Sequence, residues 1–364
     1  MNDHMKLGIG IIGCGRITEK HAATLSRLGS ARVVAISDIS IERMEIIHGQ
    51  LTEAAGHTAN EIAMYPDYAD LLIHPEVNVI VIATSSGHHA DMAGDALIAG
   101  KHVIIEKPLA LTLEDSRLLS KLASQRGLNL LVCHQMRYRL PMLRIKNYIT
   151  SGLLGDLYYG VASIEISRTP DYFRQAAWRG TWDQDGGMLL NQGIHLIDLL
   201  LWFLGDVEGA YGELQKLQPG KEIEDVALAV LSFRNGTKGL VEANTVTRPG
   251  NFGYSLRLFA EKGTLIISGN QLERIERFEV RGVQIAEEEL RRLEADRDEQ
   301  LRMYEAYLDR IQNGPEGMVV DAPEASKSLE AIFAIYRSAL EGRRVTLPLT
   351  EFSTEIMKAG KWHR

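Results

Sequence analysis

The first third of the chain alternates short apolar runs with helical patterns, and this order restricts the fold more than any other feature of the sequence. The apolar runs are Leu7–Ile12, Arg32–Ile36, Val77–Ala83, His102–Glu106 and Asn129–Cys133. Apolar residues at helical spacing occupy intervals between them, at Ile17–Leu28, Ala90–Ala99 and Leu113–Gln125. Strands that alternate with helices in this way form a parallel sheet with helices on both faces. We therefore expect a doubly wound α/β domain over residues 1–133.

The pattern changes after Cys133, where one helical segment is followed by longer strand-like segments. The helix is expected at Pro141–Ser151, and the strands at Leu157–Ser167, Val226–Phe233, Gly239–Thr245 and Tyr254–Ala260. Turn signals such as "RNG" and "EKG" lie between several of these strands, as in antiparallel pairs. Further helical patterns cover residues 301–311 and Ala325–Leu340. Residues 134–364 are thus expected to form an α+β domain with a largely antiparallel open sheet.

A glycine-rich turn follows the first strand directly. In "LGIGIIGCGRITEKH", Gly13 would allow a tight turn and Gly15 would let a pyrophosphate approach the backbone. The free N–H groups of the helix that follows would face the anion. Thr18 takes the place of the third glycine, and we expect it to loosen the packing of helix on strand slightly. Many α/β proteins have glycine-rich turns, so this motif alone does not establish a nucleotide site.

Asp38 strengthens the nucleotide interpretation, because it ends the second strand, "ARVVAISD". A carboxylate at this point accepts hydrogen bonds from ribose hydroxyls and repels a 2′-phosphate. The alternative is that Asp38 caps the next helix. The segment "IATSSGHH" (Ile82–His89) ends a further strand at the edge where α/β sheets bind ligands, although it could equally be a plain turn. Together these motifs predict a Rossmann domain that binds NAD in preference to NADP.

The segment "VIIEKPLA" places Glu106, Lys107 and Pro108 at the end of another strand. Pro108 fixes the local backbone and biases Lys107 toward an extended conformation. A lysine directed into a cofactor cleft can polarise a substrate hydroxyl. A surface lysine at a strand end is the commoner situation, and the neighbouring nucleotide motif is what favours a role in chemistry.

The most apolar segment of the chain, "GGMLLNQGIHLIDLLLWFLG" (Gly186–Gly205), nevertheless carries polar residues. Asn191, His195 and Asp198 follow at spacings of four and three residues, which places them on one stripe of a helix. The run Leu196–Leu204 is shorter than the ~20 residues that span a bilayer. A buried histidine satisfied by Asp198 or by the backbone would also fit this pattern.

The composition excludes several classes of function. The formal net charge is −8, and no basic stripe with interleaved aromatic residues suggests a nucleic-acid or membrane surface. With two cysteines, Cys14 and Cys133, a disulfide framework is not expected. No His, Cys and Asp cluster shows metal-ligand spacing, so we expect no metal. We also expect no signal peptide, and a cytoplasmic location.

The combination of "GCGRI", the acidic end of strand two, "EKPL" and "GGMLLNQGIHLIDLL" resembles the Gfo/Idh/MocA oxidoreductase family. The resemblance extends over essentially the whole chain. Within that family, "YFRQAAWRGTWDQDGGMLLNQGIHLIDLL", "EIEDVA" and "RRVTLPL" are most similar to the UDP-N-acetyl-2-amino-2-deoxy-D-glucuronate 3-dehydrogenases, the WlbA-type enzymes. These enzymes resemble this chain in having Asn at position 191, where many relatives have Asp. Ser85 departs from the proline usual in the family, and we expect this to alter a loop without removing the site.

The resemblance implies that the polar stripe of the apolar helix faces the nicotinamide and a sugar. His195 would accept the hydroxyl proton as hydride leaves the same carbon, Lys107 would hydrogen-bond that oxygen, and Asn191 would orient the substrate. The roles of Lys107 and His195 could be exchanged, and Asp198 would hold the helix or the imidazole tautomer. The residues expected to hold NAD are Gly13, Gly15, Arg16, Ile17, Asp38, Thr84, Ser86, His89, Glu106 and Lys107.

A cluster of arginines and aromatic residues precedes the apolar helix. Planar guanidinium groups clamp diphosphates and carboxylates, so this cluster suits a nucleotide sugar. The residues expected to bind substrate, with Asn191 and His195, are Arg137, Arg168, Tyr172, Trp178 and Arg179. The alternative for the cluster is a structural contact at a domain or subunit boundary.

The leading hypothesis is an NAD-dependent dehydrogenase that oxidises the C3 hydroxyl of a UDP-linked N-acetylglucosaminuronic acid. One alternative is the same chemistry on a free sugar, an inositol or another polyol, because one fold hosts many substrates. Another is a non-catalytic NAD-binding sensor, which would need no proton acceptor. The resemblance also suggests a homo-oligomer, a tetramer built on the face of the second sheet.

Overall fold

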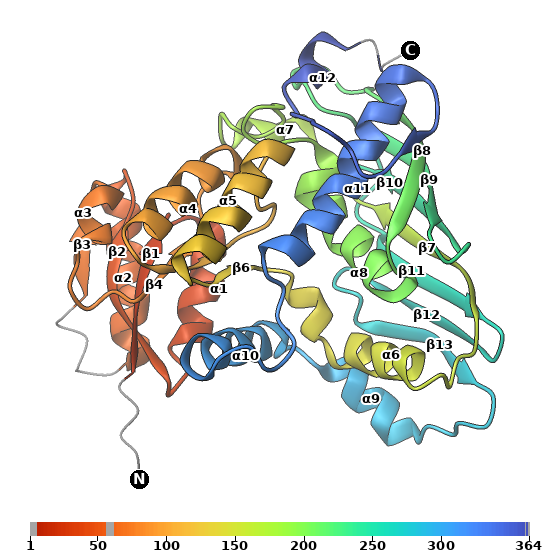
Figure 1. The fold of residues 1–364 in the computed structure, drawn as a ribbon, viewed down its shortest axis with the longest axis horizontal. Helices are drawn as coiled ribbons and strands as arrows, with labels where there is room; N and C mark the ends of the chain where they lie inside the picture. Colours follow the sequence, from red (N-terminus) through yellow and green to blue (C-terminus); the bar gives the residue numbers. More distant parts are fainter. Residues whose placement is uncertain (1–5, 56–61, 361, 363–364) are drawn as a thin grey trace. The chain divides into compact units, whose positions relative to one another are not determined.

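The structure is a computed structural model that describes residues 6–55, 62–360 and 362. It divides into two compact units (Figure 1). The first unit contains the residues up to Ala110, Asp115–Gln135 and Gln300–Glu324, and the second contains Leu111–Glu114, Met136–Glu299 and the residues from Ala325 onward. The single boundary expected near residue 133 needs correction, because a late segment of the chain packs with the first unit.

The first unit is built on a six-stranded sheet in which every neighbouring pair is parallel. The strand order is β3-β2-β1-β4-β5-β6, the doubly wound order expected from the sequence. The chain adds β2 and β3 on one side of β1 and then β4, β5 and β6 on the other side. The point where the strand order reverses is where such sheets bind ligands. The strands are β1 (Leu7–Ile12), β2 (Ala31–Ser37), β3 (Ala63–Tyr65), β4 (Val79–Ile82), β5 (His102–Ile105) and β6 (Leu130–Val132).

Helices connect and cover these strands. They are α1 (Arg16–Leu25), α2 (Ile41–Ala55), α3 (Tyr68–Leu72), α4 (His89–Ile98), α5 (Leu113–Arg126) and α10 (Glu299–Asn313). Helix α2 and strand β3 were not foreseen in the sequence. Helix α10, blue in Figure 1, lies beside the red helix α1, and Gln300 of α10 accepts a hydrogen bond from Thr24 of α1.

The second unit is built on an eight-stranded sheet of order β13-β12-β11-β7-β10-β9-β8-β14. Its pairs are antiparallel except for β7 with β10, which confirms the largely antiparallel sheet. The strands are β7 (Leu157–Glu165), β8 (Val207–Gln215), β9 (Val226–Phe233), β10 (Lys238–Asn244), β11 (Gly253–Ala260), β12 (Gly263–Gly269), β13 (Arg274–Val280) and β14 (Val345–Thr346).

One face of this sheet is covered by helices that approach the strands at glycines. A Cβ at Gly160 or Gly239 would lie 3.0 Å or less from Leu200 of α8, and one at Gly212 would lie 2.7 Å from Ile335 of α11. Helix α8 buries nearly all of its side chains, as expected for so apolar a segment. The helices are α6 (Leu140–Thr150), α7 (Pro170–Arg174), α8 (Ile194–Leu204), α9 (Glu287–Ala295), α11 (Ala322–Glu341) and α12 (Ile356–Ala359).

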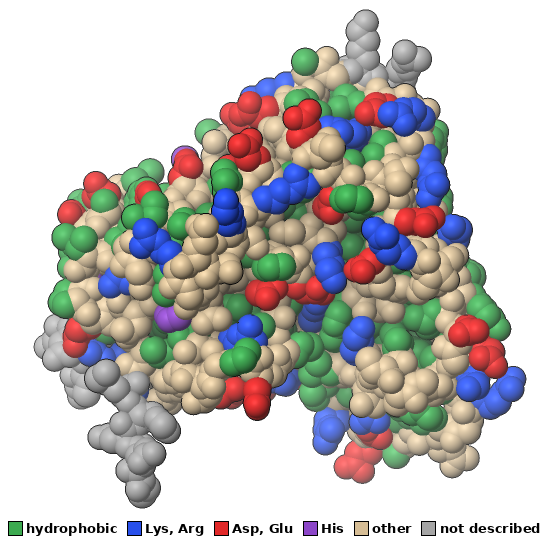
Figure 2. Space-filling model, in the orientation of Figure 1, with side chains coloured by type: hydrophobic (Ala, Val, Ile, Leu, Met, Phe, Trp, Pro, Cys, Tyr) green, Lys and Arg blue, Asp and Glu red, His purple; other side chains and the backbone are tan. Residues whose placement is uncertain are grey.

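The distribution of charged side chains and the length of the apolar helices indicate whether the protein could bind a polyanion or cross a membrane. On the face drawn in Figure 2, Lys and Arg side chains are interspersed with Asp and Glu side chains rather than gathered into a field of one sign. Such a mixed surface does not attract polyanions along an extended path on that face. No helix in the described part of the chain is long and apolar enough to cross a membrane.

Candidate active site

The turn between β1 and α1 has the geometry of a nucleotide-binding loop. Gly13 has φ +93°, and a Cβ there would lie 2.7 Å from the carbonyl oxygen of Ala83. Gly15 precedes α1 as its N-cap residue without a side-chain hydrogen bond, and no described atom lies within 4 Å of an ideal Cβ at this position. The turn therefore leaves room at the helix N-terminus, where N–H groups favour an anion.

Thr18 stabilises this turn rather than loosening it. Its side chain is buried, and its hydroxyl donates a 2.6 Å hydrogen bond to the carbonyl oxygen of Gly13. This contact lies within the turn, and the slightly looser packing of helix on strand expected at this position stays a prediction. A glycine at this position has no side chain and could not make this hydrogen bond.

Asp38 lies half-buried at the end of β2, next to the glycine turn. Its Oδ2 accepts a 2.7 Å hydrogen bond from the Cys14 N–H, and its Oδ1 accepts one of 2.8 Å from the Ser40 N–H. An ionised carboxylate has about four lone-pair sites, so capacity remains for ribose hydroxyls. The turn, the open helix terminus and this oriented carboxylate together fit a dinucleotide. Arg16 and Ile17 occupy the first two positions of α1.

The end of β4 is held by His89 rather than left open. His89 is buried, with Nδ1 2.7 Å from the Pro108 carbonyl oxygen and Nε2 3.3 Å from that of Thr84. Burial lowers the pKa of His89, so the ring is neutral and donates to one carbonyl, Pro108 having the shorter contact. His89 thus joins the ends of β4 and β5, and its expected contact with the cofactor stays a prediction. Thr84 and Ser86 lie half-buried in the turn.

Ser85 replaces the usual proline without changing the backbone that proline would impose. Its φ is −69° and its ψ 148°, and proline fixes φ near about −65°. The backbone at Ser85 therefore keeps a conformation open to proline, although the sequence led us to expect an altered loop.

Glu106 and Lys107 follow β5 at the same edge of the sheet. Glu106 is buried and accepts a 3.2 Å hydrogen bond from the Lys107 N–H through Oε2. Its Oε1 lies 3.0 Å from Nε2 of His21, a buried residue of α1. Sequence reasoning missed His21, because a histidine within a helical pattern carries no local signal of a partner 85 residues away.

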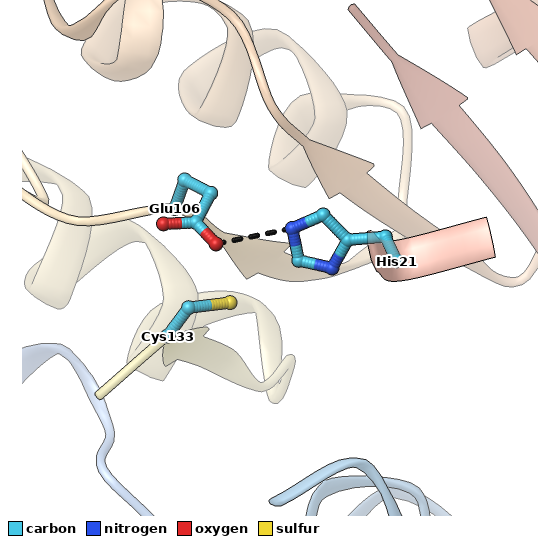
Figure 3. Close-up of side chains that lie close together, drawn as sticks. All are labelled: His21, Glu106 and Cys133. Atoms are coloured by element: carbon cyan, nitrogen blue, oxygen red, sulfur yellow. Dashed lines mark hydrogen bonds and ion pairs between the residues drawn. The ribbon is translucent and has the colours of Figure 1, made fainter. Parts of the chain in front are cut away.

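His21, Glu106 and Cys133 form a cluster of residue types that can also bind metals (Figure 3). Their potential ligand atoms all lie within 4.8 Å of one another. The two ring nitrogens of His21 face Glu106 and the Tyr304 hydroxyl, and burial raises the pKa of the Cys133 thiol well above its ordinary value. These contacts favour a hydrogen-bonded network, and the absence of a metal remains a prediction.

In the second unit, the apolar helix opens with an irregular turn that carries Asn191. Residues Leu189–Gly193 form a π-helical turn before α8, a feature that is frequent at functional sites. The Asn191 Nδ2 donates to Asp185, whose other oxygen accepts the Gly180 N–H at 2.7 Å. Gln192 donates to the Asn191 Oδ1 at 2.8 Å. Both the nitrogen and the oxygen of the Asn191 amide are thus hydrogen-bonded.

His195 lies half-buried in the first turn of α8, whereas Asp198, one turn further on, is fully buried. Both carboxylate oxygens of Asp198 accept 2.7 Å hydrogen bonds from Arg137, through Nε and Nη2. Arg137 is 3% exposed, and its guanidinium lies 5.4 Å from the centre of the Trp202 ring. This pairing fits a positioning role for Arg137, and the substrate contact expected from the sequence stays a prediction.

Arg168 and Arg179 both lie over the ring of Tyr172, 4.9 Å and 4.4 Å from its centre, and Arg179 also lies 4.6 Å from the Trp178 ring. Arg168 donates to Gln192 at 3.2 Å, so the cluster continues through Gln192 to Asn191. In the described structure, the buried Nε atoms of both arginines have no acceptor. Unsatisfied charged donors at the end of a polar network fit an anionic ligand.

The chain matches two descriptions of one protein family. Residues 7–134 match the oxidoreductase family with an NAD-binding Rossmann fold, and residues 142–266 match the GFO/IDH/MocA C-terminal domain. The chain is 26% identical to the myo-inositol 2-dehydrogenase of Thermotoga maritima, over 93% of this chain and 98% of that protein.

Solved structures give the same result. The WlbA dehydrogenase from Bordetella pertussis, in complex with NADH and UDP-GlcNAcA, is 30% identical with a TM-score of 0.84, over 94% of this chain and 99% of that chain. The WlbA dehydrogenase from Chromobacterium violaceum, with the same ligands, is 27% identical with a TM-score of 0.87, over 96% and 98%. The chain therefore belongs to the GFO/IDH/MocA family of NAD-dependent dehydrogenases.

Proposed function

We propose that this protein oxidises the C3 hydroxyl of a UDP-linked N-acetylglucosaminuronic acid, with NAD as the hydride acceptor. The observation that carries the proposal is the cluster of Arg168, Tyr172 and Arg179, joined through Gln192 to Asn191. A diphosphate and a carboxylate would supply the acceptors that two buried Nε–H groups need. A free polyol carries no such charge. The two WlbA structures with UDP-GlcNAcA support the same substrate class.

NAD would be held by the Gly13–Gly15 turn, the N-terminus of α1 and the Asp38 carboxylate, with Arg16, Ile17, Thr84 and Ser86 beside them. When bound, its nicotinamide accepts the hydride from the carbon that becomes the ketone. His195 takes the hydroxyl proton, because an imidazole titrates near operating pH. Lys107 donates a hydrogen bond to the oxygen and stabilises its developing negative charge. Asn191, with its amide fixed by Asp185 and Gln192, orients the sugar.

The test is NADH formation by the purified protein with UDP-N-acetylglucosaminuronic acid, compared with UDP-N-acetylglucosamine and myo-inositol. Each substrate is assayed with and without 2-oxoglutarate, since product that forms only with the keto acid would indicate that NADH is reoxidised in place. We expect reduction of NAD with the uronic acid alone among the three. An Arg179→Gln variant should raise KM for the uronic acid, and Arg174→Gln, an exposed arginine nearby, is the matched control.

The second candidate is a dehydrogenase of a free sugar or an inositol. The full-length similarity to a myo-inositol 2-dehydrogenase favours it. It predicts turnover of myo-inositol and no effect of Arg179→Gln on that activity. NAD binding without turnover of any hydroxyl substrate would instead support a sensor.

We also propose that the protein is a homo-oligomer, a tetramer, assembled through the uncovered face of the second sheet. On that face Tyr211, Val230 and Leu240 stand opposite one another on β8, β9 and β10, and each is at least 40% exposed. Leu228 lies next to them on β9 and is also exposed. A contiguous apolar row across three strands is typical of a surface that binds another protein.

A further inference from the structure

Helix α10 places polar side chains in the interior of the first unit. Tyr304 and Tyr307 are fully buried, and Gln300 is nearly so. Burying a hydroxyl or an amide costs free energy unless it is hydrogen-bonded. An apolar helix face would have packed on the sheet without that cost. The hydrogen-bond partners of these three side chains therefore indicate the role of the polar groups.

Tyr304 begins a chain of hydrogen bonds that ends at Lys107. Its hydroxyl lies 2.7 Å from Nδ1 of His21, whose Nε2 lies 3.0 Å from Oε1 of Glu106. The other Glu106 oxygen accepts the Lys107 N–H at 3.2 Å. Gln300 Nε2 also approaches Nδ1 of His21, at 3.1 Å. Three separate elements, α10, α1 and the end of β5, are linked in this way.

The direction of these hydrogen bonds follows from the donors. Burial raises the pKa of Tyr304 well above its ordinary value, so its hydroxyl keeps its proton. The Gln300 amide points its Nε2 toward Nδ1 of His21 at 3.1 Å, while its Oε1 lies 3.3 Å from the Thr24 hydroxyl. Nδ1 of His21 therefore faces two donors and accepts, and a neutral ring then carries its proton on Nε2. That proton is donated to Glu106, which accepts it as a carboxylate.

We propose that Tyr304 and His21 are positioning residues for the dehydrogenase reaction, holding Glu106 ionised and fixing the main chain at Lys107. This inference rests on the proposed role of Lys107. Because the Lys107 N–H is donated to Glu106, a fixed Glu106 carboxylate fixes the backbone from which the Lys107 side chain extends. Lys107 then acts as the hydrogen-bond donor to the substrate oxygen, and His195 as the base. Other titratable groups near this chain are Cys133, whose raised pKa keeps it a neutral thiol, and His89, whose pKa burial lowers.

The chain offers a matched pair of variants. Tyr304→Phe removes the donor to His21, whereas Tyr307→Phe removes an equally buried hydroxyl of the same helix that donates to the Val132 carbonyl. The first measurement needs no substrate. Competitive acetylation of Lys107 by acetic anhydride across a pH series, read by mass spectrometry, reports the charge of its amine. We expect Tyr304→Phe to shift this profile and Tyr307→Phe to leave it as in the wild type.

Ring ¹⁵N spectra of His21, assigned by their loss in His21→Gln, test the tautomer directly. We expect a protonated Nε2 and an unprotonated Nδ1 in the wild type. In turnover, Tyr304→Phe should lower kcat about tenfold or more with the Kd of NADH within about twofold, as displacement of a supporting residue does. His21→Gln, which keeps a donor toward Glu106, should retain more activity than His21→Leu.

The proposal is overturned if the two tyrosine variants give the same Lys107 profile, or if Nδ1 of His21 carries the proton. A wild-type protein that turns over no hydroxyl substrate contradicts the proposed function alone. In that case the labelling profile and the ring spectra still decide whether Tyr304 and His21 position Lys107.

Discussion

Asp38 is the side chain that we expect to separate NAD from NADP. Its carboxylate is held by the Cys14 and Ser40 N–H groups at the end of β2. We predict that Asp38→Asn lowers the preference for NAD, measured as the ratio of kcat/KM values, by about tenfold or more, because the carboxylate no longer repels a 2′-phosphate. Glu42→Gln, in the first turn of α2, is the control. An unchanged ratio would show that Asp38 only caps the turn.

His195 is predicted to act in the chemical step and not in cofactor binding. His195→Ala should lower kcat by about 10²–10⁴-fold, the usual contribution of a general base. NADH affinity, measured by fluorescence titration, should stay within about twofold of the wild type. Parallel losses of turnover and of NADH affinity would identify a structural histidine instead.

Among the secondary-structure elements, the ends of β4 and β5 are joined by His89, and this contact makes stability depend on pH. Burial lowers the pKa of His89 below its ordinary value of 6.5. Near and below pH 6.5 the unfolded chain therefore binds more protons than the folded one. The free energy of unfolding is highest above about pH 7 and falls as the pH decreases through 6.5.

We predict that urea unfolding at pH 7.5 and 5.5 shows a smaller loss of stability in His89→Asn than in the wild type. Asparagine keeps an N–H for the Pro108 carbonyl but does not titrate. Burial lowers the pKa of His102 too, so the wild-type slope contains both groups and only the difference is assigned to His89.

Helix α8 is tied to the segment before α6 by the buried pair of Arg137 and Asp198. Removing one partner leaves a buried charge without compensation, so Asp198→Asn should lower the free energy of unfolding by about 3–5 kcal/mol. The exposed pair of Arg32 and Glu76 provides the contrast, and Glu76→Gln should cost less than about 1 kcal/mol. Equal effects in urea unfolding would mean that the Arg137 charge finds other compensation.

The sequence predicted the elements that have a clean apolar period, and it missed β8, in which glycines interrupt that period. Strands β1 and β9 have the bounds expected from their patterns. Strand β8 was missed because Gly209 and Gly212 interrupt it, and glycine is depleted in strands. The structure explains them, since a Cβ at Gly212 would collide with Ile335 of α11.

The candidate site was predictable where its residues lie in one motif, and not where partners are distant in sequence. The glycine turn and Asp38 could be recognised locally. His21 and Tyr304 are 283 residues apart, and no pattern near either one indicates the other. For the same reason the pairing of Arg137 with Asp198 could not be read from the spacing of Asn191, His195 and Asp198.

At the scale of the whole molecule, the uncovered sheet face predicts self-association. Val230→Asp combined with Leu240→Asp places two charges in the apolar row and should dissociate the oligomer, as followed by sedimentation velocity. Leu118→Asp, at an exposed position of α5, should leave the sedimentation coefficient unchanged. A wild-type protein that sediments as a monomer would contradict the proposed assembly.

The return of α10 to the first unit has a consequence for biosynthesis. Until residues 300–304 leave the ribosome, His21 lacks the Gln300 and Tyr304 side chains that meet it in the finished structure. At about 5–20 residues per second, that delay lasts roughly ten seconds or more after the six strands of the sheet have been made. The nucleotide-binding half of the enzyme is thus translated first but completed late, and a gene fragment ending near residue 134 would encode a sheet without the helix that closes it.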